Sequence, residues 1–144
     1  LYTASQCELR TWDTKKNSLI SSVKYPLDGI SCLCVNPAKN KFFTGGSNQI
    51  ISIWNLQTGE FIGKIPVLSP ITCMLVPDDN NTEDHLYTGF ADSTVKAWDV
   101  TQGKCLVNFV GHTSRVNCIV VRESILYTGS DDMSVKLWKR KTGE

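Results

Sequence analysis

The chain has 144 residues, of which 41% are hydrophobic and 9% aromatic, enough for the core of an ordinary globular domain and too many for a disordered segment. Its 15 Lys and Arg residues balance 14 Asp and Glu residues, which disfavours binding to a nucleic-acid phosphate backbone. No apolar run approaches the roughly 18 residues that span a bilayer, and no signal peptide is recognisable, so we expect an intracellular protein, cytoplasmic or nuclear, without a membrane partner.

One short pattern occurs four times along the chain. An apolar residue, an aromatic residue and a threonine are followed nine or ten residues later by a tryptophan, and successive tryptophans are 42, 44 and 40 residues apart. A unit of this length corresponds to one small sheet that cannot bury both of its faces alone, so the copies must stack on one another. The first copy opens within the pattern at Leu1, which indicates a segment of a longer polypeptide. The four tryptophans are Trp12, Trp54, Trp98 and Trp138.

Short alternating runs bounded by Gly, Pro, Asn and Asp predict four antiparallel strands in each complete copy. In the third copy they cover about residues 71–76, 85–88, 94–98 and 105–110. Each tryptophan strand is followed by a turn whose glycine can adopt the positive φ of a tight hairpin: Gly59, Gly103 and Gly143. We expect units of about 1–25, 26–66, 67–110 and 111–144, of which the first is partial and the last lacks its final strand.

The six cysteines do not have the paired spacing of a zinc site. Three of them, Cys32, Cys73 and Cys118, fall at the same phase of successive copies, as a small apolar core position would. We therefore expect structural thiols, with no metal and no cofactor. The remaining cysteines are Cys7, Cys34 and Cys105.

Short motifs stand at fixed places in the repeat, although Gly-His occurs only once. Trp12-Asp13 and Trp98-Asp99 end their strands, Gly111-His112 opens the last unit, and a Thr-Gly-Ser-Asp-Asp run from Thr128 precedes the strand of Trp138. This pattern resembles the WD-repeat β-propeller family over essentially the whole chain, although Trp54 and Trp138 are not followed by aspartate. The resemblance implies an all-β radial fold in which each four-stranded sheet is one blade, commonly seven in a closed ring. The fourteen expected strands are too few for a ring, so we expect an open arc of about three and a half four-stranded blades, completed by the remaining blades of the parent chain.

The resemblance also implies a buried hydrogen-bonded chain in the last unit, because a buried indole N–H needs an acceptor. Its expected members are His112, Thr128, Asp132 and Trp138. The third unit has Val67 where the histidine would stand, and the second has Pro26. We expect these two units to depend more on apolar packing.

No pattern of catalytic residues stands out. Ser114, His112 and Asp132 could be arranged as a triad, but Ser114 lacks the Gly-x-Ser-x-Gly turn of a nucleophile, and there is no phosphate-binding glycine loop. The acidic run 78–84 lacks the spacing of a calcium loop, which favours a solvated insertion over a calcium site or a protein contact. We therefore expect no enzymatic activity.

In propellers of this kind, the links between sheets and the turns between second and third strands gather on one face. Here the links are 25–29, 66–70 and 111–115, and the turns are 46–49, 90–93 and 130–133. Large side chains in these segments are candidate partner contacts, because aromatic residues and arginine dominate interface energetics. For Phe90, covering its own blade is an equally good interpretation. The candidates are Tyr25, Leu68, Phe90, Arg115 and Met133.

The resemblance implies a non-catalytic scaffold for protein–protein interaction, which binds proteins or peptides through its loop face and assembles a multiprotein complex. One alternative is the substrate-recognition part of a ubiquitin ligase. A second is a nucleic-acid-associated propeller, which the balanced charge disfavours.

Overall fold

The computed structural model describes residues 2–5, 8–24, 29–77 and 85–144. In these residues the regular structure is β-strand apart from one short 3-10 turn, η1 (Pro37–Lys39), and the predicted all-β class is confirmed. None of their helical segments has the length and hydropathy that crossing a bilayer requires. The acidic run 78–84, Tyr25, Pro26 and Cys7 lie outside the described residues.

The strands form four antiparallel sheets, each with its strands in sequential order. The first contains β1 (Tyr2–Ser5), β2 (Glu8–Asp13) and β3 (Ser18–Lys24). The second contains β4 (Ile30–Asn36), β5 (Lys41–Gly46), β6 (Ile50–Asn55) and β7 (Phe61–Pro66). The third contains β8 (Ile71–Leu75), β9 (His85–Phe90), β10 (Val95–Asp99) and β11 (Lys104–Phe109). The fourth contains β12 (Val116–Arg122), β13 (Ile125–Ser130) and β14 (Val135–Lys139).

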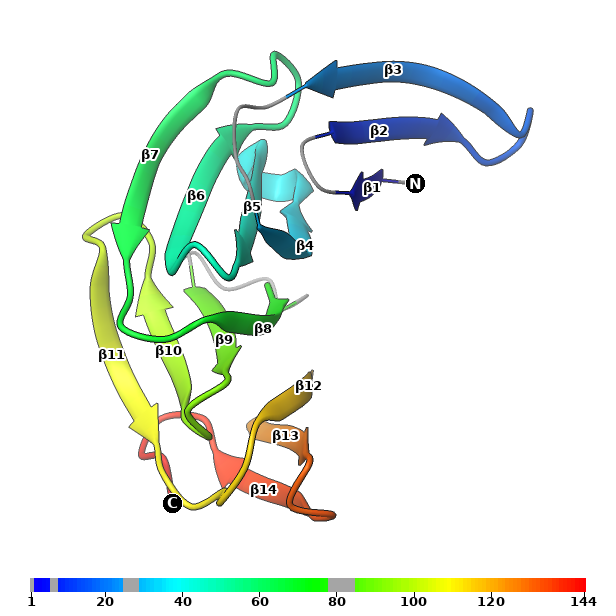
Figure 1. Cartoon of the computed structure of the whole chain (residues 1–144). Helices are drawn as coiled ribbons and strands as arrows, with labels where there is room; N and C mark the ends of the chain where they lie inside the picture. The colour runs from blue at the N-terminus through cyan, green and yellow to red at the C-terminus, as the bar shows by residue number, and fades with distance from the viewer. Residues whose placement is uncertain (1, 6–7, 25–28, 78–84) are drawn as a thin grey trace.

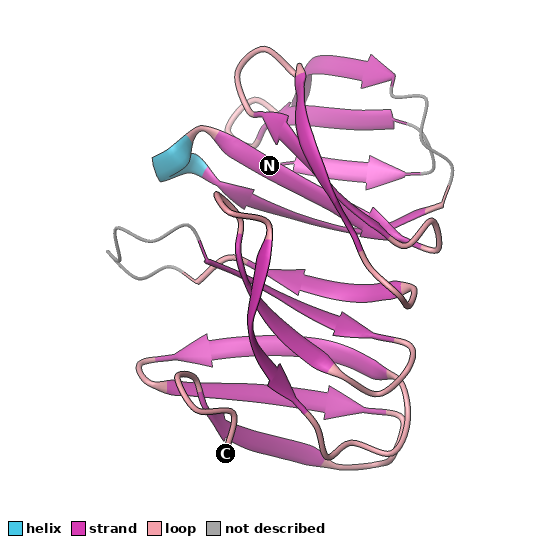
Figure 2. Cartoon of the chain, turned by 90° about the vertical axis from the view of Figure 1, so that its left-hand side faces the viewer, coloured by secondary structure: helices cyan, strands magenta, loops and turns pink. Residues whose placement is uncertain are grey.

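The four sheets follow one another around an open arc, as predicted (Figure 1). The first strands of the last three sheets, β4, β8 and β12, lie on the concave side, where β8 contacts both β4 and β12. The strands β7 and β11 lie on the convex side. Figure 2 shows the sheets stacked face to face, with η1 at one edge of the stack.

The turns after the tryptophan strands have the backbone conformation that their glycines predict. The φ angles of Gly59, Gly103 and Gly143 are 73°, 65° and 78°. In the first sheet Asn17 occupies the same position with φ 51°, because asparagine tolerates this region better than other residues with a side chain.

Neighbouring sheets pack through two different faces. Between the second and third sheets, Phe43, Ile51 and Ile53 share one buried cluster with residues of the opposite face, Leu86 and Trp98. Between the third and fourth sheets the equivalent residues are Tyr87, Val95 and Ala97 on one side and Leu126 and Trp138 on the other. The third and the fourth sheet therefore each cover the aliphatic face of the sheet before it with their own tryptophan face.

The aliphatic face of the last sheet is not covered by a described residue. Val135 is 68% exposed and Leu137 60% exposed, whereas Val95 and Ala97 at the same positions of the third sheet are 0% and 3% exposed. Val120 is exposed as well and lies in register with Leu137 across β13. We call Val120, Val135 and Leu137 the open face.

The predicted core position of Cys118 is wrong for this structure. Cys32 and Cys73 are partly buried between sheets, but Cys118 is exposed. Cys118 lies on β12 at the same phase, and no described sheet follows to cover it.

Candidate functional site

The four residues of the predicted hydrogen-bonded chain come together in the last sheet. His112 Nε2 lies 2.7 Å from Thr128 Oγ1, and His112 Nδ1 lies 2.6 Å from Asp132 Oδ2. Trp138 Nε1 donates to Thr128 Oγ1 at 2.9 Å. One proton arrangement satisfies all three contacts: the indole donates to the threonine hydroxyl, the hydroxyl to Nε2, and Nδ1 to the carboxylate. The chain of bonds thus links β13 and β14 to the segment before β12.

Asp132 is the best-connected member of this network. Its carboxylate accepts bonds from the hydroxyl and main-chain N–H of Ser134, at 2.6 and 2.9 Å, and from the main-chain N–H of Thr113 at 3.0 Å. Bonds from Ser134, and then from His112, hold the pKa of Asp132 well below its usual range. The carboxylate therefore stabilises the fold above the ordinary aspartate pKa of about 3.9, and this contribution is lost as the pH falls through the depressed pKa.

The tryptophan–threonine bond recurs in the other sheets, but the histidine does not. The indole nitrogens donate to threonine hydroxyls at 2.8 to 3.0 Å in all three. Val67, at the histidine position of the third sheet, is buried in the apolar cluster between the second and third sheets. The carboxylate of Asp92 instead accepts bonds from the N–H and hydroxyl of Thr94. The three bonded pairs are Trp12–Thr3, Trp54–Thr44 and Trp98–Thr88.

A repeated main-chain hydrogen bond holds each link between sheets beside the turn of the following sheet. In the last three sheets the residue before the first strand is Gly29, Pro70 or Arg115, and its carbonyl accepts the N–H of a turn residue at 2.9 to 3.0 Å. Three different residue types make the same main-chain contact, so the fold requires only the backbone at this position. The side chain of Arg115 is therefore free for another role. The donors are Ser47, Ala91 and Asp131. We use the name loop face for links 66–70 and 111–115 with turns 46–49, 90–93 and 130–133.

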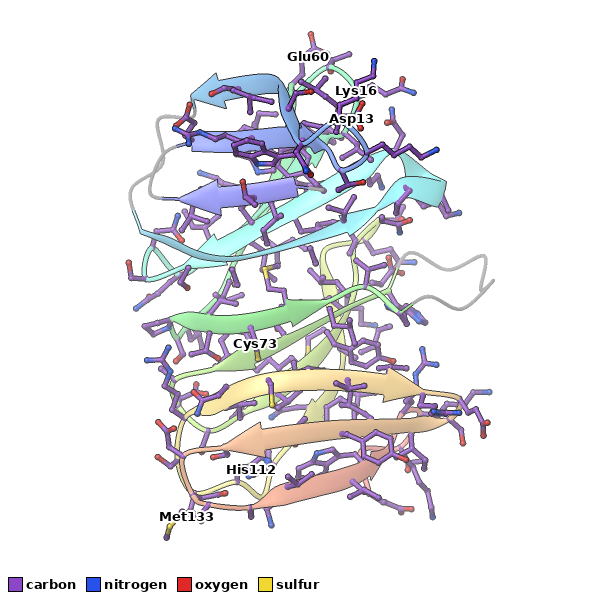
Figure 3. All side chains as sticks on the ribbon, turned by 90° about the vertical axis from the view of Figure 1, so that its right-hand side faces the viewer. Asp13, Lys16, Glu60, Cys73, His112 and Met133 are labelled. Atoms are coloured by element: carbon purple, nitrogen blue, oxygen red, sulfur yellow. The ribbon has the colours of Figure 1, made fainter. Side chains whose placement is uncertain are left out.

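The turn between β13 and β14 does not require methionine at position 133 either. Its φ is 63°, and Gln49 and Ser93 at the same position of the preceding sheets have φ angles of 57° and 73°. The turn therefore imposes the conformation whichever residue stands there. Met133 is 97% exposed and lies near His112 at one edge of the last sheet (Figure 3).

The candidate contact residues differ in their exposure to solvent. Leu68 is 91% exposed, and Arg115 is also exposed. Phe90 is wrong as a contact residue, because β9 extends to it and its ring is fully buried between the second and third sheets. The ammonium of Lys96 lies 5.4 Å from the centre of that ring. The other interpretation of Phe90, a cover for its own blade, matches this placement.

In the possible triad, both ring nitrogens of His112 bond to groups within the last sheet. The ring nitrogens of His112 contact Asp132, Thr128 and, at 3.4 Å, Ser134. The contact of Ser114 in this region is its main-chain carbonyl, which accepts the hydroxyl of Ser130. Among the residues that the structure describes, no group of three or more His, Cys, Asp and Glu side chains could hold a metal ion.

The thiols differ in their environment. Burial raises the pKa of Cys32 to about 12 and that of Cys73 to about 11, and it raises the pKa of Cys34 further still. Thiolates are the reactive form of cysteine. These three side chains are therefore protected from modification, because reagents reach them poorly and because their thiols stay protonated at neutral pH.

We expect Cys118 to react with a maleimide at least about tenfold faster than Cys32 or Cys34, because it is exposed and they are not. The measurement is labelling of native protein followed by peptide mass spectrometry, in a Cys7→Ser background. Guanidinium should make the rates of all these cysteines similar. Equal rates in the native protein would contradict the observed packing.

A family model described as "WD domain, G-beta repeat" matches residues 6–55, 59–99 and 103–139. Mitochondrial division protein 1 of Eremothecium gossypii is 26% identical over an alignment of 165 positions, which covers 94% of this chain and 23% of that protein. Human pre-mRNA-processing factor 17 is 22% identical over 137 residues, covering 92% of this chain and 24% of that protein. Myosin heavy chain kinase C of Dictyostelium discoideum is 25% identical over 142 residues, covering 99% and 17%.

The chain therefore spans about a quarter or less of the length of these relatives. The family match extends over most of its residues, and its three ranges end with the tryptophan strands β6, β10 and β14. This chain belongs to the WD domain, G-beta repeat family.

Proposed function

We propose that this chain is a non-catalytic platform whose loop face binds other proteins or peptides and helps to assemble a multiprotein complex. Proteins built from WD repeats generally serve as protein-interaction scaffolds. The observation that supports the proposal most directly is the exposure of Leu68, Arg115 and Met133 on one set of loops. Large side chains that the fold leaves exposed are the usual anchors of an interface.

The absence of catalysis is part of this proposal. The titratable pair in the last sheet, His112 and Asp132, already bonds within the fold, which leaves neither residue free to act on a substrate. One relative is named a kinase, but the match covers 17% of that protein, so we do not carry the name of the whole protein over to this segment.

We also propose that a further sheet of the same repeat covers the open face. Val135 and Leu137 stand where Val95 and Ala97 are buried by the tryptophan face of the next sheet. Burial of such a face is the contact by which repeat proteins gain stability from their neighbours. The protein that carries this chain would thus complete the arc with more blades.

An intracellular location, cytoplasmic or nuclear, belongs to the same proposal. Two similar proteins have names that refer to pre-mRNA processing and to mitochondrial division.

The platform is tested by changing its exposed side chains together. The triple variant Leu68→Ser, Arg115→Gln and Met133→Gln in an epitope-tagged protein should lose at least one partner that the unchanged protein captures from cells. Glutamine suits position 133, because Gln49 adopts the same conformation. The measurement is quantitative mass spectrometry of the captured proteins, with nuclease added so that bridging nucleic acid does not contribute.

The matched control changes three exposed aliphatic residues on the convex side, Ile20, Ile62 and Leu106, to serine. These residues lie on the outermost strands β3, β7 and β11, away from the loops. If the control triple loses the same partners, or if the loop-face triple loses none at equal abundance, the proposed platform is wrong.

A further inference from the structure

The loops of the last sheet form a rigid unit. We call residues 111–115 and 130–134 the last-sheet platform. Asp131 N–H donates to the carbonyl of Arg115 at 2.9 Å, and the hydroxyl of Ser130 donates to the carbonyl of Ser114 at the same distance. Asp132 adds a bond from the N–H of Thr113 and the contact with His112. Loops that are cross-connected in this way are pre-organised, so a ligand loses little free energy in ordering them.

The acidic side chains of this platform already have partners, whereas its cation does not. The Asp132 carboxylate is surrounded by the donors described above, and the carboxylate of Asp131 accepts a bond from the amide of Asn117. Arg115 is exposed, and within the described part of the chain no ion pair or side-chain hydrogen bond involves its guanidinium. The platform therefore presents a positive charge with five unused N–H donors.

The position of Arg115 indicates where a ligand would lie. The residue directly precedes β12, which lies on the concave side of the arc beside β8. Its positive charge partly offsets the rise in the pKa of Cys73, a residue of β8 in the third sheet. An anion bound by Arg115 would lie at the start of β12, on the concave side of the arc.

Met133 offers a different kind of contact on the same platform. Its side chain is 97% exposed and belongs to the turn whose other residues bond to the link of Arg115. A thioether adapts its shape to an apolar partner and interacts favourably with the edge of an aromatic ring. An apolar ligand side chain could therefore pack on Met133 while an anionic group binds Arg115.

We propose that the last-sheet platform recognises a short peptide segment that combines an anionic side chain with a large apolar one. The anionic group binds the guanidinium of Arg115 through two parallel hydrogen bonds, and the apolar side chain, preferably aromatic, packs on Met133. A carboxylate and a phosphate monoester present the same paired oxygens. This inference rests on the proposed platform function and specifies the class of partner.

The test uses an array of seven-residue peptides and the purified protein. One position carries glutamate, phosphoserine, glutamine or lysine, and a position two or three residues away carries Phe, Leu or Ala. We expect binding to peptides that contain glutamate or phosphoserine together with Phe or Leu. The ratio of the glutamate and phosphoserine signals identifies which anion is preferred. Arg115→Gln should weaken the best peptide about tenfold, and Met133→Gln should remove the preference for Phe over Ala.

The matched control is Arg122→Gln, which removes the same charge from an exposed arginine at the far end of the same strand β12 and should leave binding unchanged. Preference for lysine peptides, no peptide binding, or an equal effect of Arg115→Gln and Arg122→Gln would overturn the inference. Equal binding of any polyanion, including single-stranded RNA, would also overturn it. If the loop-face triple variant still loses its cellular partners in that case, the platform function stands and only the partner class is wrong.

Discussion

Replacement of His112 by alanine is expected to lower the free energy of unfolding by about 1 to 3 kcal/mol. The imidazole is buried and bonds to both Thr128 and Asp132, so alanine leaves the threonine hydroxyl without its second partner and opens a small cavity. The measurement is urea unfolding followed by circular dichroism and by tryptophan fluorescence. An unchanged midpoint and slope would show that the hydrogen-bonded chain does not stabilise the sheet.

A comparison of two threonines isolates the contribution of the histidine to the stability of the last sheet. Thr88 and Thr128 are both fully buried, and each accepts the indole N–H of its own sheet. Only Thr128 also contacts a histidine. Thr128→Val should therefore destabilise the protein more than Thr88→Val. Combined with His112→Ala it should cost less than the sum of the two single changes, because both remove the same bond. Strict additivity would mean that the two side chains act independently.

The second large effect is expected at Gly89, where alanine should destabilise the protein by about 1 to 3 kcal/mol. A Cβ atom added at this position would lie 2.6 Å from the Cys73 sulfur and 2.9 Å from the Val116 side chain, which belongs to the next sheet. Neither contact is possible without movement, and both groups lie in the packed layer between the third and fourth sheets. The expected result is a lower unfolding midpoint with unchanged strand content.

Gly129→Ala is the matched control, because Gly129 has the same position in the last sheet. Its added Cβ would lie 2.7 Å from the Cys118 sulfur, and apart from its chain neighbours no other atom of the described residues lies within 4 Å. Cys118 is exposed and its thiol can rotate into solvent, so this change should cost less than about 1 kcal/mol. Equal losses of stability from the two alanine substitutions would contradict the observation that no described sheet covers this face of the last sheet. In a third variant, Gly63→Ala, the added Cβ meets no atom within 4 Å among the described residues other than its chain neighbours, so this variant measures the intrinsic effect of alanine in a strand.

The repeat and its local chemistry could be predicted from the amino-acid sequence alone. Period-two alternation, turn residues and the tryptophan spacing are properties of neighbouring residues, so they indicate strands, hairpins and the number of sheets without knowledge of the packing. The positive φ angles of Gly59 and Gly103 follow in the same way, because few other residues adopt that conformation easily. The indole N–H of each tryptophan needs an acceptor. The threonine nine or ten residues earlier lies on the neighbouring strand, two residues beyond the position opposite the tryptophan.

Only the tertiary structure decided which of these side chains are accessible. Phe90 and Cys118 occupy repeat positions whose burial depends on whether another sheet lies against them, and that contact comes from residues far away in the chain. Arg115 is a similar case. Its carbonyl accepts the same kind of main-chain hydrogen bond as the carbonyls of Gly29 and Pro70, while its side chain remains free. Only the structure shows that the fold uses the backbone alone at this position. The sequence alone determined the repeating sheet, because local periodicity encodes it. The tertiary structure decided the surface available to a partner, because burial is a property of stacked neighbours.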